Sequence, residues 1–96
     1  MNKLGLRLRE LRKAKGLLLR QVASVMEVDT AVISKFESGS KRPSEVQVVK
    51  LADYYNIDKS ELLRLWLCDN ILDVVKDKTH ALEALELARQ TLKLSK

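Results

Sequence analysis

Residues 12–39, which read RKAKGLLLRQVASVMEVDTAVISKFESG, decide how this chain folds. Their spacing predicts that a first helix ends at Gly16, that a second short helix covers about 18–26, and that a tight turn leads to a third helix. Asp29 is a favoured N-cap for the third helix, and Gly39 is a favoured residue after its end, because glycine takes the left-handed conformation easily. The stretch therefore predicts two short helices joined by a turn and preceded by another helix.

The outward face of the third predicted helix carries small and polar groups. These residues are Thr30, Ala31, Ser34 and Lys35. A helix with such a face fits a DNA major groove, which is about 12 Å wide. There a methyl group of Thr30 or Ala31 could meet a thymine methyl, while Ser34 could hydrogen-bond a base and Lys35 could reach guanine or a phosphate. The alternative is an ordinary solvated helix face, but the surrounding pattern favours contact with bases.

Composition and charge also favour a small, helical, DNA-binding protein. The 96 residues suit one small domain, or one domain with an appendage, and the 3 Gly and 1 Pro indicate long helices. Residues 1–42 hold ten Lys or Arg against four Asp or Glu, whereas residues 69–96 hold five of each. The basic surplus thus coincides with the proposed DNA-reading region. Charge alone would also be compatible with a basic surface that only serves solubility.

Several other classes of protein are disfavoured. Cys68 and His80 are the only residues of their types, which argues against a disulfide framework and a zinc site. No apolar run approaches the roughly 20 residues that span a bilayer, and the N-terminus does not resemble a signal peptide. No nucleophile–base constellation or Gly-rich phosphate loop is evident. We therefore expect a cytoplasmic, non-enzymatic protein without metal, cofactor, membrane or evident small-molecule ligand.

Capping signals and apolar spacing define the remaining helices. Ser44 with Gln47 fits a capping box for a fourth helix, and Asp58 with Glu61 fits a second box for a fifth helix that continues to about residue 76. Thr79 or Asp77 is expected to cap a sixth helix over about 80–94. The residues expected to face inward are Leu4, Leu8, Leu11, Val22, Ala23, Val25 or Met26, Ile33, Phe36, Val48, Leu51, Ala52 and Tyr55.

This pattern resembles the Cro/CI-type helix-turn-helix family, also called XRE-type, over roughly residues 4–64. The matching residues are Leu11, Arg12, Gly16, Leu17, Val22, Ala23, Val28, Ile33, Ser34, Glu37, Gly39, Arg42, Pro43, Leu51, Ala52, Ile57 and Leu62. The resemblance implies an all-α protein with a five-helix DNA-binding domain at 1–67 and an additional C-terminal helix in an extension at 68–96. It also implies a structural ion pair between Arg12 and Glu37.

The chain departs from the family pattern at two places. The family often has glycine in the left-handed turn of the motif, where this chain has Glu27, at a cost on the order of 1 kcal/mol. The family also often begins its second helix with Ser or Thr followed by Gln, which touch a phosphate, where this chain has Leu18 and Leu19. Backbone N–H groups at that helix start, or Arg20 beside it, would have to replace this contact.

A phosphate-binding role is expected where the chain leaves the third helix and begins the fourth. Lys41 and Arg42 are followed by the helix start at Ser44, and cations beside free N–H groups suit a phosphate. Arg20 is a weaker candidate of the same kind. The alternative is a plain loop.

The apolar residues beyond position 68 are more than a five-helix domain needs for its core. Either they fold back onto the monomer or they bury against a second copy, which we favour. The expected dimer interface consists of Leu65, Trp66, Ile71, Leu85, Ala88 and Leu92. The sequence thus predicts a homodimeric, sequence-specific transcriptional regulator that binds double-stranded DNA at a roughly palindromic operator, similar to the controller proteins of restriction-modification systems. The alternative is a protein–protein module, antitoxin-like or an adaptor, that keeps the fold with weak or no DNA binding.

Overall fold

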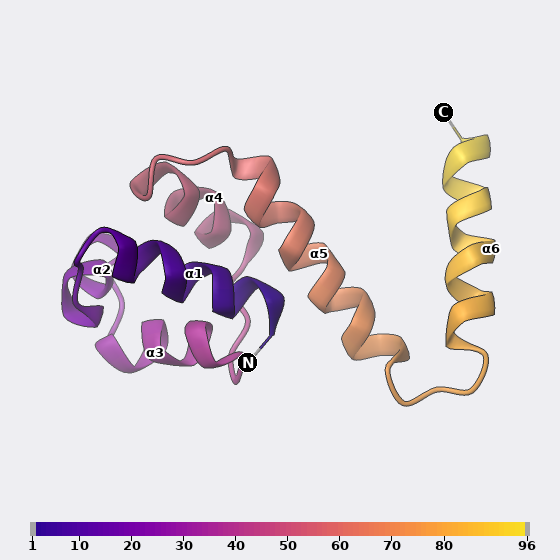
Figure 1. The fold of residues 1–96 in the computed structure, drawn as a ribbon, viewed down its shortest axis with the longest axis horizontal. Helices are drawn as coiled ribbons and strands as arrows, with labels where there is room; N and C mark the ends of the chain where they lie inside the picture. Colours follow the sequence, from indigo (N-terminus) through magenta and orange to yellow (C-terminus); the bar gives the residue numbers. More distant parts are fainter. Residues whose placement is uncertain (1, 96) are drawn as a thin grey trace.

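The computed structural model describes residues 2–95, which form six helices and no strand. The helices are α1 (Lys3–Ala14), α2 (Leu19–Met26), α3 (Thr30–Ser38), α4 (Glu45–Tyr54), α5 (Lys59–Val75) and α6 (Ala81–Leu94). Figure 1 shows α1–α4 gathered into a bundle with the first part of α5, while α5 leads away and α6 lies beyond its end. The prediction of an all-α fold with an additional C-terminal helix is confirmed.

The core is formed by one apolar face from each of the first five helices. Every residue expected to face inward is buried except one of the two alternatives at the end of α2: Met26 is buried and Val25 is exposed. Leu62 of α5 completes the core. Tyr55 is among the largest fully buried side chains, and loss of solvent raises the pKa of its phenol above the ordinary value. α6 contributes no buried residue.

All five turns between the described helices use the left-handed backbone conformation at one residue, including Asn56 after α4 and His80 before α6. Gly16 follows α1 with φ +66°, and Gly39 follows α3 with φ +86°, both as the sequence predicts. Glu27 ends α2 with φ 58°, so a side chain does occupy the left-handed position of the turn between α2 and α3. The chain accepts a strain on the order of 1 kcal/mol there, which core burial on both sides of the turn offsets.

The capping predictions hold only in part. In the capping box of α4, Ser44 N–H donates to Gln47 Oε1 at 2.9 Å and Gln47 N–H donates to Ser44 Oγ at 3.2 Å. At α5 Asp58 caps by accepting from Ser60 N–H at 3.0 Å, but the predicted second half of that box is wrong. Glu61 instead accepts from Arg7 Nε of α1 at 2.5 Å, and this hydrogen bond lowers the pKa of Glu61.

The predicted cap of α6 is also wrong. His80 is the N-cap residue, in the left-handed conformation with φ 70°, and neither Thr79 nor Asp77 occupies that position. The imidazole Nδ1 of His80 lies 2.7 Å from Glu83 Oε2 in the first turn. Similarly, Asp29 is the N-cap residue of α3 but makes no side-chain cap hydrogen bond.

The second half of α5 is tied to the start of α1. Asp69 is buried, 4% exposed, and its carboxylate accepts from Leu4 N–H at 2.9 Å and from Lys3 N–H at 3.2 Å. The first N–H groups of a helix lack partners within it and lie at its positive end, so a carboxylate is well suited to this place. Asn2 adds a bond from Gly5 N–H at 2.8 Å. The division predicted between 1–67 and 68–96 thus falls inside one helix whose later residues contact α1.

Replacement of this buried carboxylate should destabilise the bundle. We expect Asp69→Ala to lower the free energy of unfolding by about 2–3 kcal/mol, because two backbone N–H groups lose their acceptor. Urea unfolding followed by circular dichroism measures this change. The matched control is Asp53→Ala on the exposed side of α4, which should change stability by less than about 0.5 kcal/mol. Equal effects of the two variants would mean that Asp69 does not hold α1.

Candidate nucleic-acid interface

The outward face of α3 is free of core contacts. Ile33 and Phe36 point into the core and are 2% and 1% exposed, which fixes the rotation of the helix about its axis. The predicted base-contacting residues Thr30, Ala31, Ser34 and Lys35 are all exposed. The side chains on this face are short except for Lys35. Another surface could therefore approach α3 closely along this side.

A buried ion pair sets the angle between α1 and α3. Arg12 Nε donates to Glu37 Oε2 at 2.7 Å, and Arg12 Nη2 donates to Glu37 Oε1 at 3.0 Å. The remaining nitrogen, Nη1, donates to Leu17 O at 2.9 Å. The two side chains are 12% and 7% exposed, so the pair lies largely out of solvent, and its hydrogen bonds raise the pKa of Arg12. These contacts connect α1, the α1–α2 turn and α3.

Gly5 is a close-contact position that the sequence analysis missed. A Cβ atom on Gly5 would lie 2.3 Å from Glu37 O and 2.7 Å from Phe36 O, both backbone atoms. The absence of a side chain at this position lets α1 and the end of α3 approach within backbone contact. Nothing in the local sequence signals this role, because Gly5 lies inside a helix where glycine is ordinarily unfavourable.

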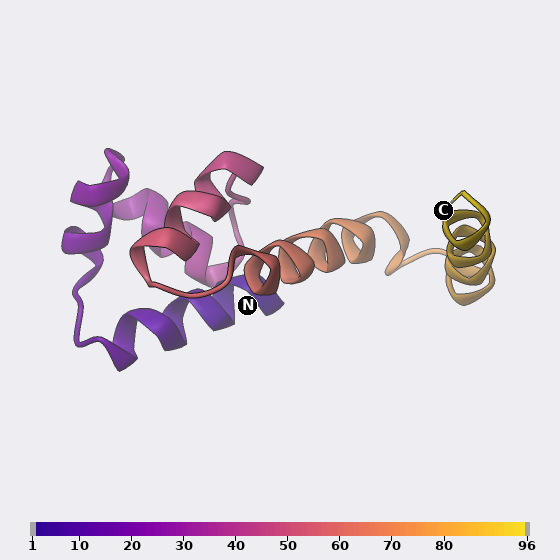
Figure 2. The ribbon, with the colours of Figure 1, turned by 90° about the horizontal axis from the view of Figure 1, so that it is seen from above.

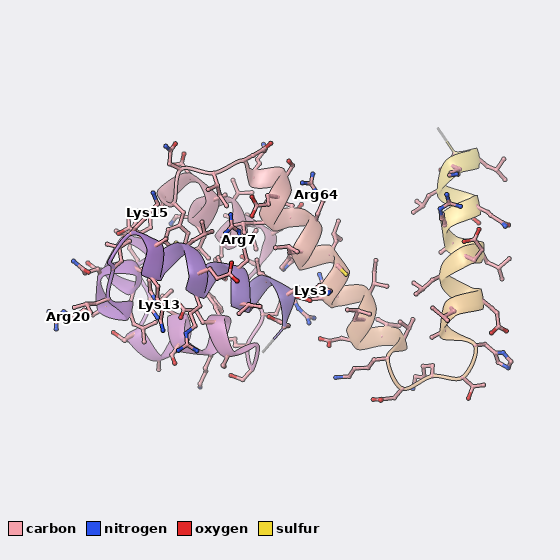
Figure 3. All side chains as sticks on the ribbon, in the orientation of Figure 1. Lys3, Arg7, Lys13, Lys15, Arg20 and Arg64 are labelled. Atoms are coloured by element: carbon pink, nitrogen blue, oxygen red, sulfur yellow. The ribbon has the colours of Figure 1, made fainter. Side chains whose placement is uncertain are left out.

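The start of α2 lacks the side-chain cap that the family pattern supplies. Leu18 is the N-cap residue and offers no polar side chain. Its N–H instead donates to Gln21 Oε1 at 2.7 Å, a role of Gln21 that the sequence analysis missed. Arg20 is exposed on the first turn, and Figure 3 shows it at the edge of the bundle, at the same end as Lys13 and Lys15. This end of the molecule is therefore rich in cations.

The loop between α3 and α4 carries the other phosphate candidates. Lys41, Arg42 and Ser44 are exposed. The backbone N–H and the hydroxyl oxygen of Ser44 both take part in the capping box, so the group that it could offer to an anion is its hydroxyl proton. The Arg42 guanidinium forms an ion pair with Asp73 of α5, which the sequence analysis did not anticipate.

The same loop is held by Trp66. Its indole Nε1 donates to Pro43 O at 2.8 Å, and its ring packs against the core together with Leu65. Both residues were predicted to lie in a dimer interface. In the monomer they are only partly exposed, and Trp66 already has a defined role in fixing the end of the α3–α4 loop.

The rest of the described chain offers few other kinds of site. Among residues 2–95, no three His, Cys, Asp or Glu side chains lie together in a way that could hold a metal ion. None of the described helices is both long and apolar enough to cross a membrane.

Comparison with known proteins agrees with this geometry. A family model described as a helix-turn-helix domain matches residues 3–65. The HTH-type transcriptional regulator AnsR of Bacillus subtilis is 34% identical over 82 residues, which are 85% of this chain and 63% of AnsR. The chain thus spans less than two thirds of that relative. The crystal structure of the restriction-modification controller protein C.AhdI from Aeromonas hydrophila superposes with a TM-score of 0.58 at 40% identity, covering 62% of this chain and 91% of C.AhdI.

Loss of one partner of the buried ion pair should be costly. We expect Glu37→Ala to destabilise the protein by about 3–5 kcal/mol, because it leaves the Arg12 charge buried without its carboxylate. The control is Glu86→Ala, which removes an exposed pair with Arg89 on α6 and should cost less than about 1 kcal/mol. Urea unfolding midpoints of the two variants give the comparison, and similar midpoints would contradict a stabilising role of the buried pair.

Proposed function

The chain belongs to the XRE-type helix-turn-helix family of DNA-binding transcriptional regulators, and from this we propose that it binds a specific, roughly palindromic operator as a homodimer. The observation that carries the proposal is the exposed face of α3, which presents Thr30, Ala31, Ser34 and Lys35 on a helix fixed by the core. A recognition helix of this kind places its first turns against base edges in the major groove.

We assign base readout to α3 and backbone contacts to the segments on either side of it. Ser34 and Lys35 have the donors and acceptors that distinguish base pairs, and Lys35 also suits guanine O6 and N7. Phosphate contacts fall to a set of exposed polar residues near the ends of α2, α3 and α4. These are Arg20, Lys41, Arg42 and Ser44. Contacts to the phosphates fix the register of the protein on the duplex, but they do not depend on the base sequence.

The apolar surface beyond the bundle supports the proposed dimer. Figure 2 shows α5 leading away from the bundle and α6 apart from α1–α4. Ile71 of α5 and the α6 residues Leu85, Ala88 and Leu92 line an apolar recess between these two helices, and Arg89 and Lys93 border it. Ile71 is 46% and Leu92 is 65% exposed, which is costly for apolar side chains on an isolated monomer. A second copy would cover them.

The balanced charge of the C-terminal region is compatible with such an interface. Residues 69–96 carry equal numbers of basic and acidic side chains, so two copies would not repel each other there. In the dimer, the two α3 helices should stand about 34 Å apart on one side, the distance of one turn of DNA. The protein would act by binding alone, without catalysis, in the cytoplasm.

A protein–protein module remains the second candidate. The family's usual residues are absent at the start of α2, at Leu18 and Leu19, and in the turn after it, at Glu27. An adaptor or antitoxin-like protein could keep the fold without the family's usual DNA contacts at these positions. The similarity to a controller protein favours the regulator, and by analogy it favours control of restriction-modification genes. Duplexes selected from a random pool would identify the operator and show whether it has two symmetric half-sites.

The salt dependence of duplex binding separates these candidates. For a regulator, affinity for duplex DNA should fall steeply as salt rises, with a logarithmic slope of roughly −0.9 per phosphate contact, because cations are released from DNA.

Lys35→Ala should weaken binding to the selected operator by about 1–3 kcal/mol and leave binding to random DNA unchanged. Arg42→Ala should weaken binding to both kinds of duplex about equally. Fluorescence anisotropy with both duplexes at several salt concentrations measures these effects.

Two results would change the assignment. Absent or salt-insensitive duplex binding would favour the protein–protein module. A Lys35→Ala variant that loses affinity equally for all sequences would make Lys35 a phosphate contact. Ser34→Ala provides an uncharged comparison, because it can change base readout without changing the net charge.

The dimer is tested by charges placed on one side of α6. We expect Leu85→Glu with Leu92→Glu to produce a monomer with much weaker operator affinity, because the second half-site is no longer tethered. The matched control is Leu87→Glu with Leu94→Glu, which adds the same charge on the opposite side of the helix at 100° per residue. Sedimentation velocity and operator binding provide the readouts. If the first variant still dimerises, the interface lies elsewhere.

A further inference from the structure

The loop between α3 and α4 is bound to α5 through both its backbone and a charged side chain. Trp66 Nε1 donates to Pro43 O at 2.8 Å, one residue after the Arg42 side chain that pairs with Asp73. Trp66 and Asp73 lie seven residues apart, two turns along α5, so they share one side of that helix. The same side of α5 therefore fixes the loop backbone and holds its arginine.

The ion pair lies where a DNA phosphate is expected to bind. Arg42 uses Nη2 to contact Asp73 Oδ2, and a carboxylate presents to a guanidinium the same kind of charged oxygen pair as a phosphate. Since Arg42 is a proposed phosphate contact, the carboxylate occupies a donor that the DNA backbone would use. The hydrogen bond from Arg42 lowers the pKa of Asp73, so its side chain is ionised throughout the neutral range.

The ion pair between Arg42 and Asp73 can be replaced easily by a contact between Arg42 and a phosphate. The Arg42 and Asp73 side chains are 32% and 51% exposed, and ion pairs at such positions contribute little net stability. Lys76, which directly follows the last residue of α5, has its Nζ 3.9 Å from Asp73 Oδ1. If Arg42 moves to a phosphate, Lys76 can therefore neutralise the carboxylate that it leaves. The bundle itself does not need to change.

We propose that Asp73 competes with the DNA backbone for Arg42, and so limits the affinity of this protein for every duplex. The proposal rests on the assignment of Arg42 as a phosphate contact. In the free protein Asp73 neutralises Arg42, and on DNA the guanidinium exchanges the carboxylate for a phosphate while Asp73 turns to Lys76. Asp73 touches no base, so it lowers specific and non-specific affinity by the same factor.

The test is a double-variant cycle on the full chain. Asp73→Asn should strengthen binding to both the selected operator and random duplex about two- to fivefold, the range expected for an exposed ion pair. The control for net charge is Asp77→Asn, which removes the same charge four residues later, and it should give a smaller increase. When Arg42 is replaced by alanine, Asp73→Asn should increase duplex affinity no more than Asp77→Asn does. Anisotropy titrations at fixed salt measure all five proteins beside the wild type.

Each other outcome overturns the proposal in a distinguishable way. Equal gains from Asp73→Asn and Asp77→Asn would show a general charge effect. Weaker binding by Asp73→Asn would show that Asp73 orients Arg42 for the phosphate. If Arg42→Ala leaves all duplex affinities unchanged, the phosphate assignment fails together with the proposal. If the wild type binds no duplex, the proposed function itself fails. Thermal unfolding of Asp73→Asn confirms that an altered affinity does not come from misfolding.

Discussion

The orientation of α3 depends on the pairing of Arg12 with Glu37, and the rest of the proposed DNA-binding surface depends on that orientation. The guanidinium uses all three nitrogens, two on the carboxylate and one on Leu17 O, so it fixes two helices and a turn at once. Gly5 permits the backbone of α1 to approach the same end of α3. Because charges at this depth are stable only with a complete set of partners, the geometry has little freedom to drift.

α5 connects parts of the molecule that the sequence keeps far apart. Along its length it contacts Arg7 through Glu61, the loop carbonyl of Pro43 through Trp66, the start of α1 through Asp69, and Arg42 through Asp73. The same helix carries Ile71, which lines the apolar recess with α6. The part of the proposed dimer interface that lies on α5, at Ile71, would therefore be joined by continuous helix to the contacts with the loop beside α3, whereas the part on α6 follows residues 76–80.

The sequence predicted those features that depend on neighbouring residues or on a fixed period. Helix limits were predicted from apolar spacing and from residues such as Ser44 and Gly39. The left-handed turn at Glu27 was expected from the resemblance to the helix-turn-helix family. The sequence could not predict contacts between distant segments. Glu61 was predicted to complete a capping box because it lies three residues after Asp58, but in the fold Arg7 of α1 binds its carboxylate instead. Asp69, Trp66 and Gly5 carry no local signal of their partners.

The distribution of strong and weak contacts follows the demands of the proposed function. The contacts that fix the helices around α3 are buried: Arg12 pairs with Glu37 of α3, and the buried carboxylate of Asp69 holds the start of α1. Such contacts resist exchange with water and ions. Those at the expected DNA backbone, such as Arg42 with Asp73, are exposed and easily exchanged. The proposed base readout needs a rigid helix, because a rotation of α3 would move Lys35 away from the base edges that it is proposed to contact. The proposed phosphate contacts need only a cationic side chain that can reach the DNA backbone. The buried pair of Arg12 and Glu37 holds α3 rigidly, whereas the exposed pair of Arg42 and Asp73 beside it can exchange partners. The same small fold therefore meets both requirements.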